Sequence, residues 1–264
     1  MDKLGFLVNI IREMDKVVVA YSGGVDSTLV LKVASMTLDN NVLAVTASSE
    51  SFPPDELSFA KAIASSINAQ HRIIRTEELR DDNFSSNPPD RCYYCKKELF
   101  GKLSEIAAKE GYHYVLDGTN ADDVQDWRPG RRAATELKVR SPLLEAQLRK
   151  KEVRDISFRL GLPTWDKPAT PCLSSRFPYG HRITAEGLER VLRAEDYLKG
   201  FGLRELRVRD YGKTARIEVM PEELHLLVRE DVRTKVIAFF KSLGYKFISL
   251  DLQGFRSGSL NEEI

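Results

Sequence analysis

The chain has 264 residues and a net charge of +1, and 42% of its residues are hydrophobic and 30% charged. This composition is ordinary for a soluble globular protein, and the near-neutral charge excludes a polybasic binder of nucleic acids or membrane surfaces. No apolar run approaches the roughly 20 residues that span a bilayer, so we expect no membrane partner. Residues 1–15 have charged and apolar residues at helical spacing, which predicts a packed helix rather than a signal peptide and therefore a cytoplasmic location.

The first half of the chain alternates strand and helix signals. Strands separated by helices predict an α/β fold, a parallel sheet with helices on both faces, in which ligands bind outside the carboxyl ends of the strands. We expect strands at 17–20, 42–46, 71–75 and 114–116, and helices at 27–36, 53–67 and 96–109.

The second half has a different rhythm. Residues 163–180 contain four prolines, and because such long loops are usually functional, we interpret this stretch as an active-site loop. The sequence predicts a first domain over 1–165 and a smaller C-terminal α/β domain over 166–264, for substrate binding or oligomerisation. The expected elements are helices at 150–160, 184–198 and 233–243 and strands at 206–209, 215–220 and 246–250.

The strongest motif is Tyr21-Ser22-Gly23-Gly24-Val25-Asp26-Ser27, between an expected strand and an expected helix. Glycines let the backbone approach a phosphate, hydroxyls donate hydrogen bonds, and the helix N-terminus supplies unpaired N–H groups. Asp26 suits this anion site if Mg²⁺ lies between its carboxylate and the phosphate. The motif is neither a Walker A loop nor the G-x-G-x-x-G dinucleotide fingerprint.

A second motif, Leu116 to Asp123, follows another expected strand. Its carboxylates could hold Mg²⁺ or position a nucleotide. Without the first motif, a turn at a strand end with an Asx cap would be the favoured interpretation.

The three cysteines, Cys92, Cys95 and Cys172, cannot all pair within one chain. The residues leave open a structural zinc site completed by a histidine, a redox pair at Cys92 and Cys95, or a [4Fe–4S] cluster held by three thiolates. Such a cluster leaves one iron open, and an open iron can carry an extra sulfide. Three unrelated buried cysteines are the simplest alternative.

The phosphate loop resembles the Ser-Gly-Gly-x-Asp-Ser loop of the PP-loop ATP-pyrophosphatase superfamily. With the second motif and the cysteine-bearing segment 171–180, the chain resembles the LarE family of ATP-dependent sulfur transferases. Further segments that carry this resemblance are 126–130, 207–209 and 250–258. The resemblance implies an adenine-nucleotide alpha hydrolase-like fold and adenylation, with pyrophosphate release, of a pyridinium dicarboxylate mononucleotide. The adenylated carboxylates become thiocarboxylates during nickel-pincer nucleotide synthesis.

The resemblance also implies roles for individual residues. One branch of the family sacrifices the sulfur of the cysteine matching Cys172, whereas the three cysteines of this chain resemble the iron–sulfur branch. Arg207 and Arg209 alternate with Val208 on an expected strand and so share a face. Glu195 and Glu218 are candidates for a second acidic or metal-binding feature. The implied sites are nucleotide binding by Ser22, Gly23, Gly24, Asp26, Ser27 and Gly118, Mg²⁺ binding by Asp26 and Asp123, sulfur handling on the cluster by Cys92, Cys95 and Cys172, and binding of the substrate phosphate by Ser175, Arg176, Arg207 and Arg209.

Two other functions remain open at this point. A tRNA thiolation enzyme also combines such a loop with three cysteines, although the composition shows no broad basic surface and we expect no nucleic-acid partner. A nucleotide-binding regulatory module would bind ATP or AMP without catalysis. We also expect the chain to form a homo-oligomer.

Overall fold

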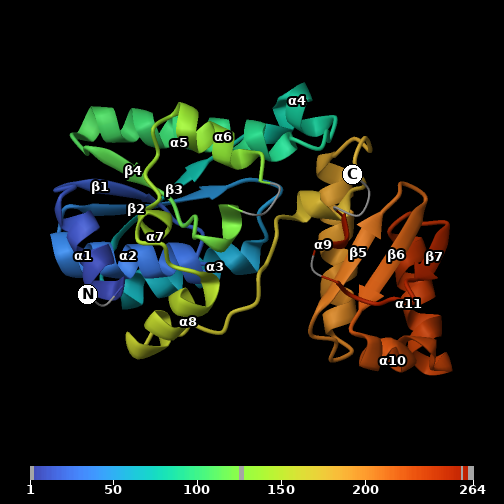
Figure 1. Cartoon of the computed structure of the whole chain (residues 1–264). Helices are drawn as coiled ribbons and strands as arrows, with labels where there is room; N and C mark the ends of the chain where they lie inside the picture. Colours follow the sequence, from blue (N-terminus) through green and yellow to red (C-terminus); the bar gives the residue numbers. More distant parts are fainter. Residues whose placement is uncertain (1–2, 125–127, 257, 261–264) are drawn as a thin grey trace. The chain divides into compact units, whose positions relative to one another are not determined.

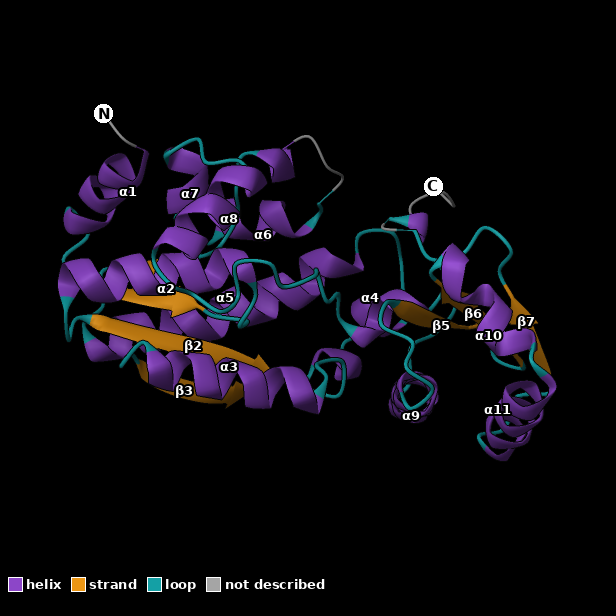
Figure 2. Cartoon of the chain, turned by 90° about the horizontal axis from the view of Figure 1, so that it is seen from below, coloured by secondary structure: helices purple, strands orange, loops and turns teal. Residues whose placement is uncertain are grey.

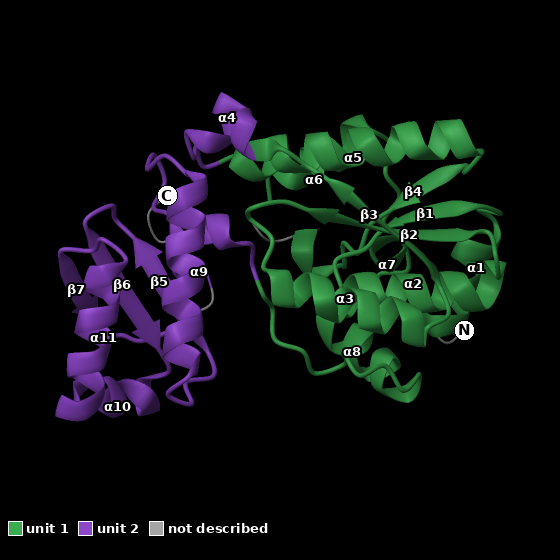
Figure 3. Cartoon of the chain, turned by 180° about the vertical axis from the view of Figure 1, so that it is seen from behind, with its two compact units in different colours: residues 1–78, 90–170 green, residues 79–89, 171–264 purple. Residues whose placement is uncertain are grey.

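The computed structural model describes residues 3–124, 128–256 and 258–260. Asp126, Trp127 and Ser257, which lie in segments that carry the family resemblance, are outside the described residues. The chain forms two compact units, coloured separately in Figure 3. Unit 1 comprises residues 1–78 and 90–170, and unit 2 comprises residues 79–89 and 171–264. The domain boundary expected from the sequence, between residues 165 and 166, stays a prediction.

The strands of unit 1 form a parallel sheet in the order β3-β2-β1-β4. Their bounds are Gln70–Arg75, Val42–Ser48, Val17–Ala20 and Tyr114–Leu116. Val17 of β1 pairs with Val42 of β2 on one side and with Tyr114 of β4 on the other. The parallel sheet expected from the sequence is confirmed.

Helices cover both faces of this sheet (Figure 1). Alternate side chains of a buried strand point to opposite faces, so Val17 and Val19 join one core while Val18 joins the other. The first core is formed with α1 (Lys3–Arg12), α2 (Val25–Leu38), α3 (Pro54–Ser66), α7 (Pro142–Glu145) and α8 (Lys150–Arg159). The second core is formed with α5 (Arg91–Glu110) and α6 (Gly130–Glu136). The sequence did not predict α6 and α7.

Unit 2 has a sheet of its own. Strands β5 (Leu206–Asp210) and β6 (Thr214–Val219) form an antiparallel hairpin, and β7 (Phe247–Leu250) pairs parallel to β6. Figure 2 shows α9 (Ala185–Lys199) and α11 (Glu230–Ser242) on the same side of these strands, where they share an apolar core. The shorter helices of this unit are α4 (Asp82–Ser85) and α10 (Leu224–Val228).

A side-chain hydrogen bond marks the start of α9. The hydroxyl of Thr184 accepts a hydrogen bond from the backbone N–H of Gly187 at 3.1 Å and so caps the N-terminus of the helix. No helix in the described parts of the chain is long and apolar enough to cross a membrane.

Candidate active site

The phosphate loop connects the carboxyl end of β1 to the start of α2. The Ser27 hydroxyl donates to the Gly24 carbonyl at 3.2 Å, so the Ser22 hydroxyl, 3.1 Å from the Ser27 oxygen, is the donor of that pair. Gly23 has a φ of +75°, and a Cβ there would lie 2.9 Å from the Ala60 Cβ of α3. Glycine is therefore required at this position, and it lets the loop bend tightly against α3.

The second motif lies directly against this loop. A Cβ at Gly118 would approach the Ser27 nitrogen to 2.9 Å and the Asp26 Cβ to 3.1 Å. The neighbouring Asp117 carboxylate accepts hydrogen bonds from the backbone N–H of Thr119 at 3.0 Å and from the Ser141 hydroxyl at 2.7 Å. Asp117 thus stabilises the turn that brings Gly118 to the phosphate loop.

The carboxylates expected to bind Mg²⁺ are connected through Asn120. Its side-chain amide donates to Asp26 Oδ1 at 3.1 Å, and its backbone N–H donates to Asp123 Oδ2 at 3.0 Å. The other Asp26 oxygen pairs with the Lys150 ammonium, and Asp123 pairs with Arg128 at 2.8 Å. Burial raises the pKa of Asp123, and the charge of Asp26 adds to that effect.

These two carboxylates fit part of a magnesium site. Mg²⁺ is usually bound by one or two carboxylates together with phosphate oxygens of the substrate. Within the described residues, no group of three or more His, Cys, Asp or Glu side chains is arranged to hold a metal ion. Binding of Mg²⁺ by Asp26 and Asp123 therefore stays a prediction.

Two lysines next to the phosphate loop were not predicted from the sequence. Lys150 begins α8 and pairs with Asp26. Lys167 places its ammonium 2.7 Å from Glu56 Oε2 and 3.5 Å from the Gly23 carbonyl. For Lys167, the sequence offered only its position in the expected active-site loop. That position is weak evidence for a functional role, because lysines are common on protein surfaces.

The paired cysteines lie at the start of α5. Cys92 is exposed and Cys95 is partly exposed, and residues three apart in a helix share one side of it. A Cβ at Gly130 would lie 2.9 Å from Lys96 Cγ and 3.4 Å from the Cys92 carbonyl, so α6 packs closely on this turn. Binding of an iron–sulfur cluster by these cysteines stays a prediction. Cys172 is exposed and belongs to unit 2.

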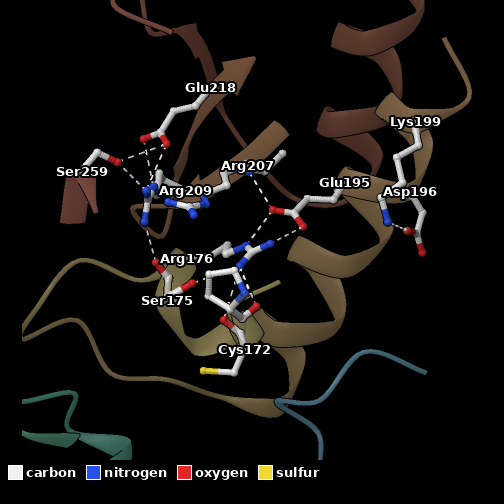
Figure 4. Close-up of polar contacts among 12 residues, drawn as sticks. Cys172, Ser175, Arg176, Glu195, Asp196, Lys199, Arg207, Arg209, Glu218 and Ser259 are labelled. Atoms are coloured by element: carbon white, nitrogen blue, oxygen red, sulfur yellow. Dashed lines mark hydrogen bonds and ion pairs between the residues drawn. The ribbon is translucent and has the colours of Figure 1, made fainter. Parts of the chain in front are cut away.

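Among its described residues, unit 2 contains two bidentate ion pairs that are buried (Figure 4). Arg176 donates to both oxygens of Glu195 at 2.8 and 3.0 Å, and Arg209 donates to both oxygens of Glu218 at 2.9 and 3.0 Å. The four side chains are buried. Glu195 and Glu218 thus serve as partners of the arginines, and each pair is satisfied without a ligand.

Both arginines also organise the turn that carries Cys172. Arg176 donates to the Cys172 carbonyl at 3.4 Å and to the Ser175 hydroxyl at 3.0 Å, and Arg209 donates to the Ser175 carbonyl at 2.6 Å. The Arg209 guanidinium reaches Ser259 at 2.7 Å as well. The ion pairs therefore fix the backbone on which the Cys172 thiol is exposed.

Arg207 differs from these two arginines. It is buried, yet its guanidinium has no carboxylate partner among the described residues, and it donates only a long hydrogen bond of 3.4 Å to the Arg256 carbonyl. Burial and the positive charges of Arg209 and Arg176 lower its pKa to about 10. Arg207 remains charged at neutral pH, so it is the cation in this cluster best suited to receive an anion.

Known proteins resemble the chain to different extents. A family model described as NAD synthase matches residues 4–87, which include the phosphate loop. An uncharacterized protein of Synechocystis sp. is 49% identical over 98% of this chain and 97% of its own length. The pyridinium-3,5-bisthiocarboxylic acid mononucleotide synthase of Lactiplantibacillus plantarum is 40% identical over 99% of this chain and 95% of its own length.

A more distant likeness is partial. The tRNA-specific 2-thiouridylase MnmA of Leptospira biflexa is 26% identical, over 67% of this chain and 57% of its own length. The likeness to the synthase, in contrast, runs through both units and confirms the resemblance drawn from the sequence motifs. The chain belongs to the LarE family of the PP-loop superfamily.

Proposed function

We propose that this protein uses ATP to adenylate the carboxylates of a pyridinium dicarboxylate mononucleotide and then replaces a carboxyl oxygen with sulfur, as a step of nickel-pincer nucleotide synthesis. The observation that carries the proposal is the 40% identity, over 99% of the chain, to a protein named as the corresponding synthase. The close approach of Gly118 to Ser27 and Asp26 at the phosphate loop supports it.

The chemistry requires activation because a carboxylate oxygen is a poor leaving group. Attack of that oxygen on the α-phosphate of ATP forms an acyl-adenylate and releases pyrophosphate. A sulfur nucleophile then attacks the acyl carbon, so that a C–S bond forms and the C–O bond to AMP breaks. The protein chiefly positions these groups and neutralises their charge.

Each residue group has a part in this scheme. The hydroxyl and backbone donors of Ser22, Gly24 and Ser27 hydrogen-bond one another within the loop and would turn to the polyphosphate when it binds. Lys150 offsets the charge of Asp26. A magnesium ion held by Asp26 and Asp123 would neutralise phosphate charge when bound. Lys150 must then share Asp26 with that ion.

The substrate phosphate is assigned to the cluster around Arg207. A guanidinium binds phosphate oxygens through paired hydrogen bonds, and Arg207 has this capacity to spare. Ser175 lies in the turn that Arg176 and Arg209 fix, so its hydroxyl is available beside the same cations. Arg176 and Arg209 contribute positive charge while they remain paired.

Sulfur handling is assigned to the three cysteines. Cys92 and Cys95 share one side of α5, and Cys172 follows the loop that leaves unit 1. A [4Fe–4S] cluster, when bound, would supply a sulfide at its open iron. Held by these three thiolates, it would leave none of them to be sacrificed.

The experiment that tests this proposal is an anaerobic assay of pyrophosphate release with ATP and the pyridinium dicarboxylate mononucleotide. Release that depends on the mononucleotide supports the proposal. Release that depends on tRNA instead would favour a thiouridylase, the activity named for the more distant relative. Nucleotide binding without any pyrophosphate release would indicate a binding module.

A further inference from the structure

Residues 167–172 connect unit 1 to Cys172, and the first of them, Lys167, lies beside the phosphate loop. Unit 1 ends at Thr170, three residues after Lys167, and unit 2 resumes at Pro171 and Cys172. The Lys167 side chain is only 14% exposed, and its ammonium pairs with Glu56 at 2.7 Å. A lysine buried to this degree is unusual in a connecting segment, where side chains normally face solvent.

Lys167 contacts both the phosphate loop and α3, the helix that packs against this loop. Glu56 lies in the first turn of α3, the helix against which Gly23 packs. The same ammonium lies 3.8 Å over the Phe59 ring of α3 and 3.5 Å from the Gly23 carbonyl. An ammonium has three donors, and the one directed at Gly23 makes only a long contact. This donor is available to a phosphate oxygen at the loop.

The backbone around Lys167 is held as well. Arg154 of α8 donates through one guanidinium nitrogen to the Trp165 carbonyl and through the other to the Lys167 carbonyl, both at 2.9 Å. The Trp165 ring meets the Phe158 ring of α8 edge to face, with centroids 5.1 Å apart. Arg154 thus holds the backbone on the N-terminal side of this segment. A change in the contacts of the ammonium therefore affects mainly the residues that follow Lys167, at positions 168–172.

We propose that Lys167 is a positioning residue that couples nucleotide binding at the phosphate loop to the ordering of the segment that carries Cys172. A polyphosphate at the loop takes the weakly used donor of Lys167 and forms a charge-assisted hydrogen bond, which is stronger than the contact to the Gly23 carbonyl. The ammonium is then held by Glu56 and by phosphate together. The chain that follows it loses conformational freedom only when nucleotide is present. This inference rests on the proposed use of ATP and assigns a role that the adenylation chemistry itself does not require.

The test compares hydrogen exchange in the full-length protein with and without magnesium and α,β-methylene-ATP, which is not cleaved between its α- and β-phosphates. Nucleotide affinity is measured in parallel by calorimetry. We expect the nucleotide to slow exchange of amides in residues 169–172 of the wild-type protein by about threefold or more. Lys167→Met should bind nucleotide and lose this protection, and Lys167→Arg should restore part of it. Lys151→Met, a change at an exposed lysine of α8, is the matched control and should behave as wild type.

The outcomes separate this inference from the proposed function. Equal protection in Lys167→Met and wild type, or nucleotide binding without protection in wild type, would overturn the coupling role while leaving ATP use intact. A wild-type protein that binds no nucleotide would overturn both. A general loosening of unit 1 in Lys167→Met, visible as faster exchange in β1 and α2 without nucleotide, would show a merely structural role.

Discussion

The ammonium of Lys150, at the start of α8, pairs with the carboxylate of Asp26, 124 positions earlier in the chain and within the phosphate loop. The Lys150 backbone N–H donates to Asp122 at 2.9 Å, and Asn120 donates to the second Asp26 oxygen. The phosphate loop, the second motif and α8 therefore form one connected polar cluster. An uncompensated Asp26 would repel a triphosphate, and Lys150 offsets that repulsion.

Replacing this lysine should weaken nucleotide binding. We expect Lys150→Met to lower the affinity for ATP by about tenfold, or ~1.4 kcal/mol, because the site then loses one of the positive charges that offset Asp26 and the phosphates. Isothermal calorimetry measures the effect, and the exposed neighbour Lys151→Met is the control. An unchanged ATP affinity in Lys150→Met would remove this lysine from the nucleotide site.

The approach of the second motif to the phosphate loop gives another prediction. Gly118→Ala should destabilise the protein by about 1–3 kcal/mol and weaken ATP binding, because the new Cβ meets the backbone of Ser27 at 2.9 Å. Gly101 lies within α5, and a Cβ added there would meet no other atom within 4 Å. Gly101→Ala should therefore be neutral or stabilising by about 0.5–1 kcal/mol. Urea titration of both variants compares them, and equal stabilities would contradict the packing argument.

The ion pairs of unit 2 are expected to be structural. Glu195→Ala leaves the Arg176 guanidinium buried without its carboxylate and should cost about 3–5 kcal/mol. Glu189→Ala, an exposed change in the same helix, should cost less than about 0.5 kcal/mol. Chemical denaturation measures both values. Similar losses in the two variants would show that the Arg176–Glu195 pair contributes little.

Arg207 should oppose folding at neutral pH and favour binding of an anion. Its pKa is about 10 in the folded chain and higher when unfolded, so below pH 10 both states are charged and the folded state bears the penalty of a buried cation. That penalty declines as the pH rises above about 10, because the folded chain loses its proton before the unfolded chain does. We expect Arg207→Met to raise the melting temperature at pH 7, by about 2–4 °C per kcal/mol of relieved penalty.

The same variant should lose a response to phosphate. Inorganic phosphate should raise the melting temperature of the wild-type protein and of Arg204→Met, which changes an exposed arginine, but not that of Arg207→Met. Stabilisation of Arg207→Met by phosphate to the wild-type extent would place the anion elsewhere.

The elements with continuous apolar runs could be predicted closely from the sequence. The strands at Val17–Ala20 and Tyr114–Leu116 have the bounds that their patterns indicate, because buried parallel strands read as short apolar runs. Helix α6 was missed since its seven residues, beginning at Gly130 and rich in arginine, give too short a pattern. The helical periodicity that identifies α5 needs several turns to be recognised.

The candidate site could be predicted only where a motif is contiguous. The phosphate loop was found because its glycines and hydroxyls follow one another in the chain. Lys150 and Lys167 were missed because folding alone brings them to Asp26 and Gly23. Likewise, residue type suggested that Arg176 and Arg209 could bind oxyanions, but not that buried carboxylates of the same unit already occupy both guanidinium groups.

The cysteines lead to a prediction about iron. After anaerobic purification, Cys92→Ala should lose the iron and acid-labile sulfide that the wild-type protein carries, because three thiolates are the ligands of the proposed cluster. Colorimetric iron and sulfide analysis measures both. A full iron complement in Cys92→Ala would count against a cluster held by three cysteines.

The product of the complete reaction tests the central claim most directly. The purified protein is incubated anaerobically with ATP, magnesium and the pyridinium dicarboxylate mononucleotide, and mass spectrometry follows the mononucleotide while AMP is quantified. The account predicts thiocarboxylate product, with AMP released in proportion to the sulfur incorporated. Consumption of ATP with both carboxylates unchanged would contradict it.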